Sequence, residues 1–282
     1  MSFFEWAVRR ERENCAAIVA SQNEYTPIVD VNIIHNGNVI TYAPEGVEIK
    51  GHIFNIHGGG LIAGTCEQND LFCKWLADRG YVVYAIDYPL LPEINFTDQV
   101  YAVCNAIWST LPQTYDYPRY LIADSAGCLL AVIANAIFHP DVHWHITNDF
   151  ECDDFYEKNI KFDGVWLNCP MLETIGFNEF GLFMAKHCFG KNPRYKSYLK
   201  DIYRELCCYL PETTVVIASH SDKLKKQAET IFQMYPCSIG YGAQTKKEHN
   251  HDWNVLNPML DDWTADLNDW AMRCLELKES CK

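Results

Sequence analysis

The stretch ADSAG places Ser125 between a strand-like run and a helix-like run. Residues 119–123 (RYLIA) precede it, and residues 126–138 (AGCLLAVIANAIF) have the length and composition of a helix. A serine in this strand–turn–helix setting can act as a nucleophile, because the sharp turn exposes its hydroxyl group. The usual pattern is G-x-S-x-G; Ala123 replaces its first glycine, and Gly127 keeps the second. Ser125 is therefore a candidate nucleophile, with a helix-capping serine as the alternative.

A second motif, HGGG at residues 57–60, follows the apolar run IFNI. Consecutive glycines allow backbone N–H groups to turn toward one point, which is what the stabilisation of a developing oxyanion requires. A glycine turn alone can be purely structural. Acyl transfer, however, needs both a nucleophile and oxyanion donors, so the two motifs together predict a serine hydrolase.

A base, and an acid that orients it, should follow the nucleophile in the order Ser, Asp or Glu, His. Asp222 lies in SHSDKL, directly after a strand-like run, where α/β folds keep their reacting groups. The same residue can cap the helix-like segment that follows it. For the base, the segment EHNHDW offers His249 and His251, and the spacing leaves the choice between them open.

No metal site and no organic cofactor are predicted. The pair His249 and His251 is closely spaced, and so is the pair His143 and His145, but no further cluster of Cys, His or carboxylate residues with metal-ligand spacing accompanies either pair. Hydrolysis through an activated serine needs neither kind of group.

The order of five motifs resembles a known family. HGGG, YAIDYPLLPE, DSAG, SHSDKL and HDWNVLNP are similar to the motifs of the hormone-sensitive-lipase-like carboxylesterases, which have the α/β-hydrolase fold. The resemblance runs from about Val47 to the carboxyl terminus. It implies that Ser125 is the nucleophile, Asp222 the acid and His251 the base.

The resemblance also implies the remaining parts of the site. The oxyanion donors would be the backbone N–H groups of Gly59, Gly60 and Ala126. A small helical cap over the site would correspond to residues 1–25 and 173–209.

One departure from the family's pattern concerns Pro89, which stands where an arginine is usual after the tyrosine. We therefore expect a salt link near Asp87 and Glu93 to be missing. Such a loss concerns stability more than chemistry.

The elements that must hold these residues alternate along the chain. Runs rich in β-branched and aromatic residues are separated by segments with helical spacing, at residues 47–56, 81–87, 119–123, 162–168 and 213–219. This alternation predicts an α/β fold with a mostly parallel central sheet flanked by helices, in a single domain over residues 1–282. A turn at residues 36–38 predicts an antiparallel hairpin at the sheet edge, and the polar segment 139–159 predicts a surface excursion.

Composition limits the partners and the compartment. The 23 Lys and Arg residues against 37 Asp and Glu residues give a formal charge of −14, which argues against nucleic acid. Thirteen cysteines without C-x-x-C spacing suit a reducing compartment, so we expect a cytoplasmic protein with free thiols. Neither a secretion signal nor a membrane span is predicted. From the hydrolase motifs and the family resemblance, we expect a small-molecule ester as the partner; the oligomeric state is open, with a homodimer among the options.

Three functions fit these observations. The first is a carboxylesterase for small to medium acyl esters, a preference suggested by aromatic residues of the expected cap, Phe177, Phe180, Phe183 and Phe189. The second is an amide hydrolase of the arylformamidase type, which would use the same residues. The third is a non-catalytic binding protein on the same scaffold.

Overall fold

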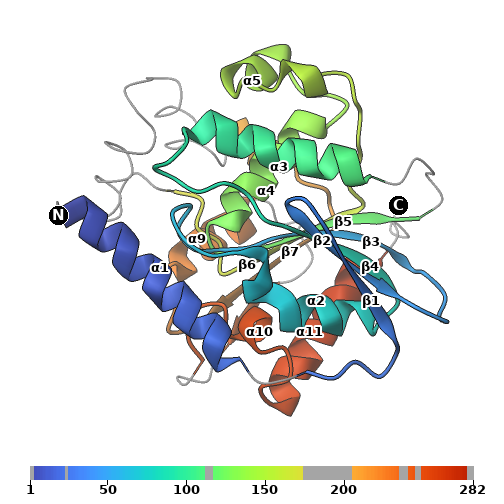
Figure 1. The fold of residues 1–282 in the computed structure, drawn as a ribbon. Coiled ribbons are helices and arrows are strands. Elements are labelled where there is room, and N and C mark those ends of the chain that lie inside the picture. Colours follow the sequence, from blue (N-terminus) through green and yellow to red (C-terminus); the bar gives the residue numbers. More distant parts are fainter. Residues whose placement is uncertain are drawn as a thin grey trace.

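A mostly parallel sheet forms the centre of the molecule. The computed structural model describes residues 3–22, 25–111, 117–173, 205–234, 241–244 and 249–277. Within these ranges, eight strands form one sheet in the order β1-β2-β4-β3-β5-β6-β7-β8 (Figure 1). The strands are β1 (Val31–Asn36), β2 (Val39–Pro44), β3 (Gly51–Ile56), β4 (Tyr81–Ile86), β5 (Arg119–Asp124), β6 (Gly164–Asn168), β7 (Thr214–Ser219) and β8 (Tyr241–Gln244). All neighbours from β4 to β8 are parallel, which confirms the predicted sheet.

The antiparallel hairpin lies at the sheet edge, as predicted. β1 pairs with β2, and β2 pairs antiparallel with β4. Gly37 has φ of 60° in the turn, a left-handed conformation that glycine adopts without steric cost.

Helices cover both faces because strand side chains alternate between two apolar cores. Phe54 and Ile56 point into one core with α3, α4 and α9, whereas Ile53 points into the other with α2 and α11. Figure 1 shows α3 and α4 above the sheet and α2, α10 and α11 below it. These helices are α2 (Asp70–Ala77), α3 (Phe96–Thr110), α4 (Gly127–Phe138), α9 (Lys225–Met234), α10 (Trp253–Leu256) and α11 (Asp262–Leu275).

The structure differs from the sequence expectations in three elements. The strand expected over residues 47–56 begins only at Gly51. β8 was not predicted. The segment 139–159 is more than a surface excursion: it contains α5 (Trp144–Asp149) and buries Ile146 and Phe150 in the core. Its few apolar residues face α3 and α4 and were hidden by the polar composition.

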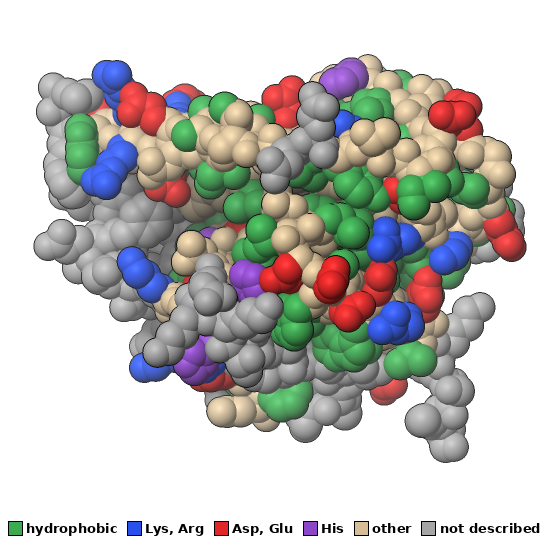
Figure 2. All heavy atoms as spheres, turned by 90° about the horizontal axis from the view of Figure 1, so that it is seen from below, with side chains coloured by type: hydrophobic (Ala, Val, Ile, Leu, Met, Phe, Trp, Pro, Cys, Tyr) green, Lys and Arg blue, Asp and Glu red, His purple; other side chains and the backbone are tan. Residues whose placement is uncertain are grey.

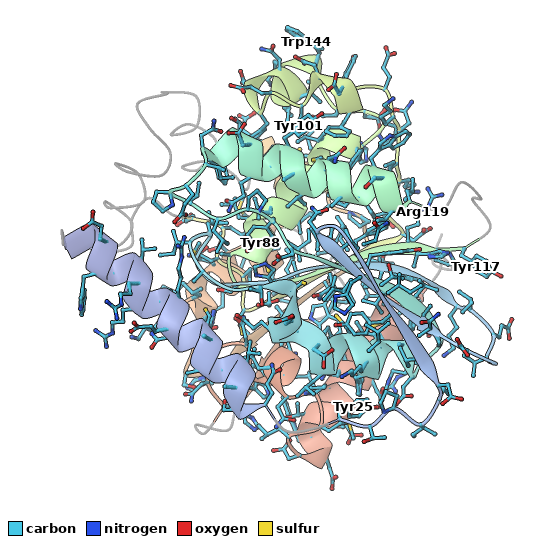
Figure 3. All side chains as sticks on the ribbon, viewed as in Figure 1. Tyr25, Tyr88, Tyr101, Tyr117, Arg119 and Trp144 are labelled. Atoms are coloured by element: carbon cyan, nitrogen blue, oxygen red, sulfur yellow. The ribbon has the colours of Figure 1, made fainter. Side chains whose placement is uncertain are left out.

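Side chains of the upper layer confirm this packing. Trp144 on α5 points outward and is 54% exposed, whereas Tyr88 lies inside the molecule (Figure 3).

The acidic composition shows at the surface. On the face in Figure 2, acidic side chains gather near the centre beside apolar ones, with Lys and Arg scattered around them. Among the described helices, none has the length and apolar character needed to cross a bilayer.

The amino-terminal helix α1 (Phe3–Ser21) is attached to the body through Arg12. Its guanidinium group donates two hydrogen bonds to the carboxylate of Glu93, at 2.8 and 2.7 Å, and Nε donates to the carbonyl of Ile62 at 2.8 Å. A salt link to Glu93 therefore exists, contrary to the expectation drawn from Pro89. Its arginine comes from a distant helix, which spacing along the chain could not show.

The sheet topology brings the candidate residues together at the carboxyl ends of the parallel strands. β3 lies between β4 and β5, so the chain changes its direction of winding there, and the loops at the carboxyl ends of β3 and β5 line a cavity. Ile56 pairs with Ala123, and Asp124 pairs with Asn168. The HGGG loop, Ser125 and the loop after β6 consequently start side by side.

Candidate active site

Ser125 occupies a strained turn between β5 and α4. Its φ is 47°, in the left-handed region that non-glycine residues rarely adopt, and its N–H donates to the carbonyl of Asn168 at 2.9 Å. Gly127 is required here, because a Cβ atom on it would lie 2.3 Å from the carbonyl oxygen of Ile56. Ala123, the departure from the usual pattern, fits in the core with 1% exposure. The structure therefore has the strand–turn–helix context that the sequence predicted.

The HGGG loop lies against the serine turn. The N–H of Gly58 donates to Oδ2 of Asp124 at 2.8 Å, and a Cβ atom on Gly58 would come within 2.5 Å of that oxygen. Gly59 and Gly60 have φ of 106° and 62° and line a cavity beside Ser125. These positive φ values turn the loop sharply beside the serine hydroxyl.

The N–H groups expected to bind an oxyanion are those of Gly59, Gly60 and Ala126. Ala126 is buried and immediately precedes α4. Within the described part of the chain, no hydrogen bond uses any of these three N–H groups. No carbonyl group of the described residues therefore occupies them, and donors to a substrate must be unoccupied in this way.

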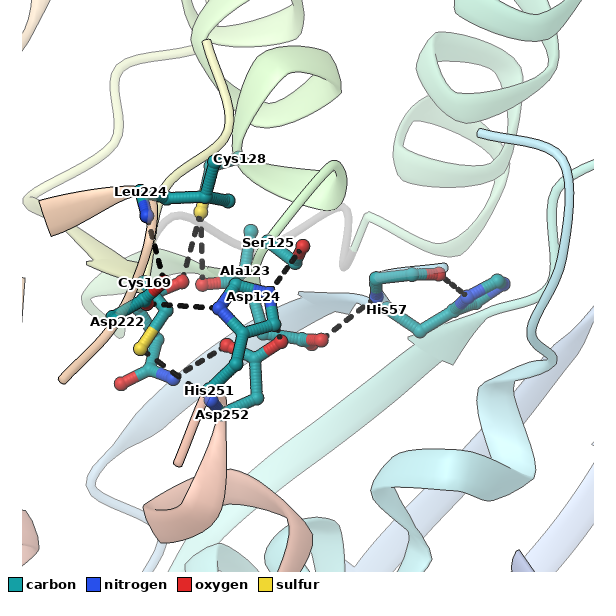
Figure 4. Close-up of polar contacts among 12 residues, drawn as sticks. His57, Ala123, Asp124, Ser125, Cys128, Cys169, Asp222, Leu224, His251 and Asp252 are labelled. Carbon is teal, nitrogen blue, oxygen red and sulfur yellow. Dashed lines mark hydrogen bonds and ion pairs between the residues drawn. The ribbon is translucent and has the colours of Figure 1, made fainter. Parts of the chain in front are cut away.

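His251 connects Ser125 to Asp222 (Figure 4). Its Nε2 lies 2.7 Å from the hydroxyl oxygen of Ser125, and its Nδ1 lies 2.8 Å from Oδ2 of Asp222. Asp222 follows β7, and its Oδ1 accepts a hydrogen bond from the N–H of Leu224 at 2.8 Å, just before α9. Asp222 thus supports the start of the following segment and holds the imidazole at the same time.

His249, the alternative base, lies elsewhere. Its Nε2 is 3.3 Å from Oδ2 of Asp261, and its ring stacks on Trp253 with centroids 5.4 Å apart. The rings of His143 and His145 stack on each other, 5.6 Å apart, beside and within α5. Of the histidines weighed from the sequence as bases or metal ligands, only His251 contacts Ser125.

The site also contains a carboxylate that sequence analysis missed. Oδ2 of Asp252 lies 3.0 Å from Nε2 of His251, the same nitrogen that faces Ser125. Oδ1 of Asp252 accepts a hydrogen bond from Nδ2 of Asn168 at 3.1 Å, and its N–H donates to Sγ of Cys169 at 3.4 Å. Its φ of 55° lies in the left-handed region. The sequence signal was only its position next to the histidine.

The protonation of the site follows from burial and from these contacts. Burial alone would lower the pKa of His251, but the carboxylates of Asp252 and Asp222 outweigh burial and raise it to about 9. Burial raises the pKa of Asp252 well above its ordinary value. Burial would also raise the pKa of Asp222, but the hydrogen bond and charge of His251 lower it. Burial raises the pKa of Asp124 to about 6 despite the donors Asn69 and Gly58.

Three potential metal ligands meet in this region of the described chain. Atoms of Cys169, Asp222 and His251 lie within 4.8 Å of one another. The contact of 2.8 Å between His251 and Asp222 is a hydrogen-bond distance. Ligand atoms around a tetrahedral zinc stand farther apart, about 3.3 Å or more. The arrangement is therefore explained by hydrogen bonding within the site.

A cavity of about 520 Å³ opens onto Ser125 and His251. The His251 side chain is 38% exposed there. The cavity is lined from α1, the glycine loop, the serine turn and the loops after β6 and β7; side chains that contribute include Glu11, Cys15, Ile18, Gln68, Met171, Glu173, Lys223, Leu224 and Leu256. α1, part of the expected cap, thus forms one wall. Residues 174–204, with the four phenylalanines named above, lie outside the described residues.

Comparison with known proteins identifies the family and the fold. The sequence profile of a family described as alpha/beta hydrolase fold matches residues 53–236. That segment includes the glycine loop, Ser125 and Asp222, whereas His251 follows it. The profile match bears out the α/β-hydrolase resemblance of the motifs.

Solved esterases share the architecture. Esterase B from Lactobacillus rhamnosis superposes with a TM-score of 0.79 at 20% identity, over 96% of this chain and 93% of that one. A hyperthermophilic esterase from the archaeon Pyrobaculum calidifontis gives a TM-score of 0.66 at 18% identity, over 96% and 92%. A thermostable carboxylesterase cloned from a metagenomic library gives 0.64 at 18% identity, over 96% of both chains. At these identities, the likeness establishes the fold.

Proposed function

Because the chain belongs to the α/β-hydrolase family, we propose that it is a serine carboxylesterase. The observation that carries the proposal is the position of His251, with one ring nitrogen 2.7 Å from the Ser125 hydroxyl and the other 2.8 Å from the Asp222 carboxylate. A nucleophile, a base and an orienting acid within hydrogen-bond reach are the parts that acyl transfer requires.

The reaction would proceed in two halves. Nε2 of His251 takes the proton of Ser125 while Oγ attacks the ester carbonyl, and the N–H groups of Gly59, Gly60 and Ala126 hold the oxyanion of the tetrahedral intermediate. Asp222 keeps the Nδ1–H tautomer and stabilises the imidazolium. His251 then protonates the leaving alcohol, and water repeats the attack on the acyl-enzyme.

The substrate class that we propose is esters of small to medium acyl chains. The cavity of about 520 Å³ has room for such groups, and most of its lining surface is apolar. One structural neighbour, esterase B, which is 20% identical to this chain, was crystallised with a tributyrin phosphonate. Both points support short chains over long-chain triglycerides.

Covalent labelling tests the mechanism directly. A fluorophosphonate probe, followed by intact mass, should add once to the wild type and should fail to add to Ser125→Ala and His251→Ala. Ser109→Ala, a change of an exposed serine on α3, is the control and should still be labelled. If folded wild type is not labelled at any pH between 6 and 10, the hydrolase mechanism is wrong and a binding protein becomes the better hypothesis.

Substrate comparison separates the two hydrolytic functions. The carboxylesterase proposal expects p-nitrophenyl acetate and butyrate to be turned over faster than a formanilide. A preference for the formanilide would favour the arylformamidase alternative. The cytoplasmic location and a homodimer stay predictions.

A further inference from the structure

Three side chains contact the two ring nitrogens of His251, which is one more than a catalytic triad uses. Nδ1 faces Asp222 at 2.8 Å. Nε2 faces the hydroxyl of Ser125 at 2.7 Å and also Oδ2 of Asp252 at 3.0 Å. Because Nε2 has either one proton or one lone pair, its two partners compete for it.

The contact with Asp252 requires a proton. If His251 is neutral with its proton on Nδ1, Nε2 carries a lone pair, and an ionised carboxylate oxygen at 3.0 Å would face it without a hydrogen. The contact is favourable only if Nε2 is protonated and donates to Asp252, or if Asp252 is protonated and donates to Nε2. Both states hold the same number of protons. In both, Nε2 is unable to take the proton of Ser125.

Asp252 is held in this position from the other side. Its side chain is 6% exposed, Oδ1 accepts from Asn168 at 3.1 Å, and its backbone N–H donates to Cys169 at 3.4 Å. Its φ of 55° lies in the left-handed region, which Asp, Asn and Gly adopt more readily than other residues. The carboxyl group is therefore not free to rotate into solvent.

The surroundings also favour retention of the proton. Among the described residues, the titratable groups whose charges act on Asp252, or on which its charge acts, are His251, Asp222, Asp124, Cys169 and Cys128. All of these except the imidazole are acids. The negative charges of Asp124 and Asp222 disfavour a further negative charge on Asp252. A buried carboxyl group beside other carboxylates keeps its proton to higher pH.

We propose that Asp252 is a positioning residue that shares one proton with Nε2 of His251 and thereby blocks the base, so that hydrolysis begins only when this proton leaves. The inference rests on the proposed function, because it assigns His251 as the base. The site would be an esterase that is restrained at neutral pH and released in mildly alkaline solution.

Two substitutions at residue 252 make different predictions. Asp252→Gly suits the left-handed φ and removes the carboxyl group, so Nε2 faces Ser125 alone. Asp252→Asn also suits this φ and removes the charge, but Asn168 Nδ2 will orient the amide oxygen of residue 252 toward itself, which leaves an N–H group to donate to Nε2. We expect both variants to hydrolyse esters at lower pH than the wild type does. Asp252→Asn should have a smaller kcat than Asp252→Gly, because its amide N–H competes with Ser125 for Nε2.

The experiment is the pH dependence of kcat/KM for p-nitrophenyl butyrate between pH 5 and 10. The acid limb of the wild type should lie near pH 9, from the raised pKa of His251. In Asp252→Gly it should move toward about 6.5, and activity at pH 7 should rise roughly tenfold or more. Asp261→Asn, which changes the carboxylate beside His249 and keeps a capping side chain, should leave the limb in place.

A second measurement separates this inference from the proposed function. The imidazole of His251 is titrated by NMR in wild type and in Asp252→Gly, whether or not either hydrolyses esters. A fall in the titration midpoint on removal of Asp252 supports the shared proton, and inactive protein at every pH would then refute only the esterase proposal. An unmoved midpoint together with an unmoved acid limb would overturn the role of Asp252, and lower activity of Asp252→Gly at pH 7 would do the same.

Discussion

Two histidines at the carboxyl ends of the parallel strands, His57 and His251, each lie near an aspartate, but their pKa values are shifted in opposite directions. His57 follows β3, is completely buried and stacks on Tyr88 with centroids 4.2 Å apart. Its Nδ1 donates to the carbonyl of Gly58 at 2.7 Å, and its Nε2 is 3.7 Å from Asp87. Burial lowers its pKa to about 4.

His251 shows the opposite balance. Its side chain is partly exposed to the cavity, and carboxylates lie at 2.8 and 3.0 Å from its two nitrogens. These contacts outweigh burial and raise its pKa to about 9. A nearby aspartate is therefore not enough to raise the pKa of a buried histidine. Carboxylates within hydrogen-bond distance raise the pKa of His251 in spite of burial, whereas Asp87, 3.7 Å from His57, does not offset the effect of burial on His57.

The largest expected effect comes from replacing the aspartate beside His251 with asparagine, compared with the same replacement beside His57. Asp222→Asn removes the partner that sets the tautomer of His251, and kcat should fall about 10⁴-fold. Asp87→Asn should hardly change kcat, because neutral His57 needs no counter-charge and the amide oxygen still accepts from the N–H of Cys66. Steady-state kinetics of both variants on p-nitrophenyl butyrate checks this, and equal losses would remove the distinction between the two pairs.

The second prediction concerns titration of both histidines in the wild type. Long-range ¹H–¹⁵N NMR spectra should show His57 neutral from pH 5 upward, since its pKa is about 4, and His251 losing its proton near pH 9. A base with a raised pKa is protonated, and cannot act as a base, when the pH falls below that pKa. The rate of hydrolysis should therefore decline from pH 9 toward pH 6. A titration of His57 near neutral pH would contradict the role of burial.

The third prediction is structural. His57→Leu removes a buried hydrogen bond to Gly58 and the stacked contact with Tyr88, so the free energy of unfolding should fall by about 2 to 3 kcal/mol in urea denaturation. His145→Leu, a change of an exposed histidine, should alter it by about 0.5 kcal/mol or less. Similar losses in both variants would show that burial does not separate them.

The smallest effect is expected at Arg12, which fixes α1 beside the glycine loop. Arg12→Ala removes an ion pair that is partly exposed, so the cost in unfolding free energy should be about 1 kcal/mol or less. KM should rise more than kcat falls, because α1 carries Glu11 and Cys15 of the cavity wall. Arg12→Lys should behave like Arg12→Ala, since lysine lacks the planar fork that contacts Glu93. An unchanged KM in both variants would show that the position of α1 does not affect substrate binding.

Local pattern in the sequence was enough for much of the fold. Periodicity predicted the central strands, the edge hairpin and the mostly parallel sheet, because side-chain alternation and turn residues are local properties. β8 and the helix within residues 139–159 were missed. A segment of mixed polarity shows its buried residues only when a neighbour is present to cover them.

The candidate site divides in the same way. Ser125 and the HGGG loop could be identified from spacing, because a tight turn and small residues are written in consecutive positions. The choice of His251 over His249 came from the family resemblance, and in the structure it depends on which ring reaches Ser125. Asp252 was passed over because nothing along the chain tells which way its carboxylate turns.

What the sequence by itself determined is the set of elements and the types of reacting groups, since these depend on residues close together in the chain. What only the tertiary structure decided is distance and burial: the partner of Glu93, the opposite pKa shifts of His57 and His251, and the contact between Asp252 and Nε2 of His251. The physical reason is that a hydrogen bond forms only when donor and acceptor are within about 3.2 Å, and that burial strengthens the interactions of charged groups and disfavours unpaired charge. Such distances arise from packing between segments far apart in the sequence.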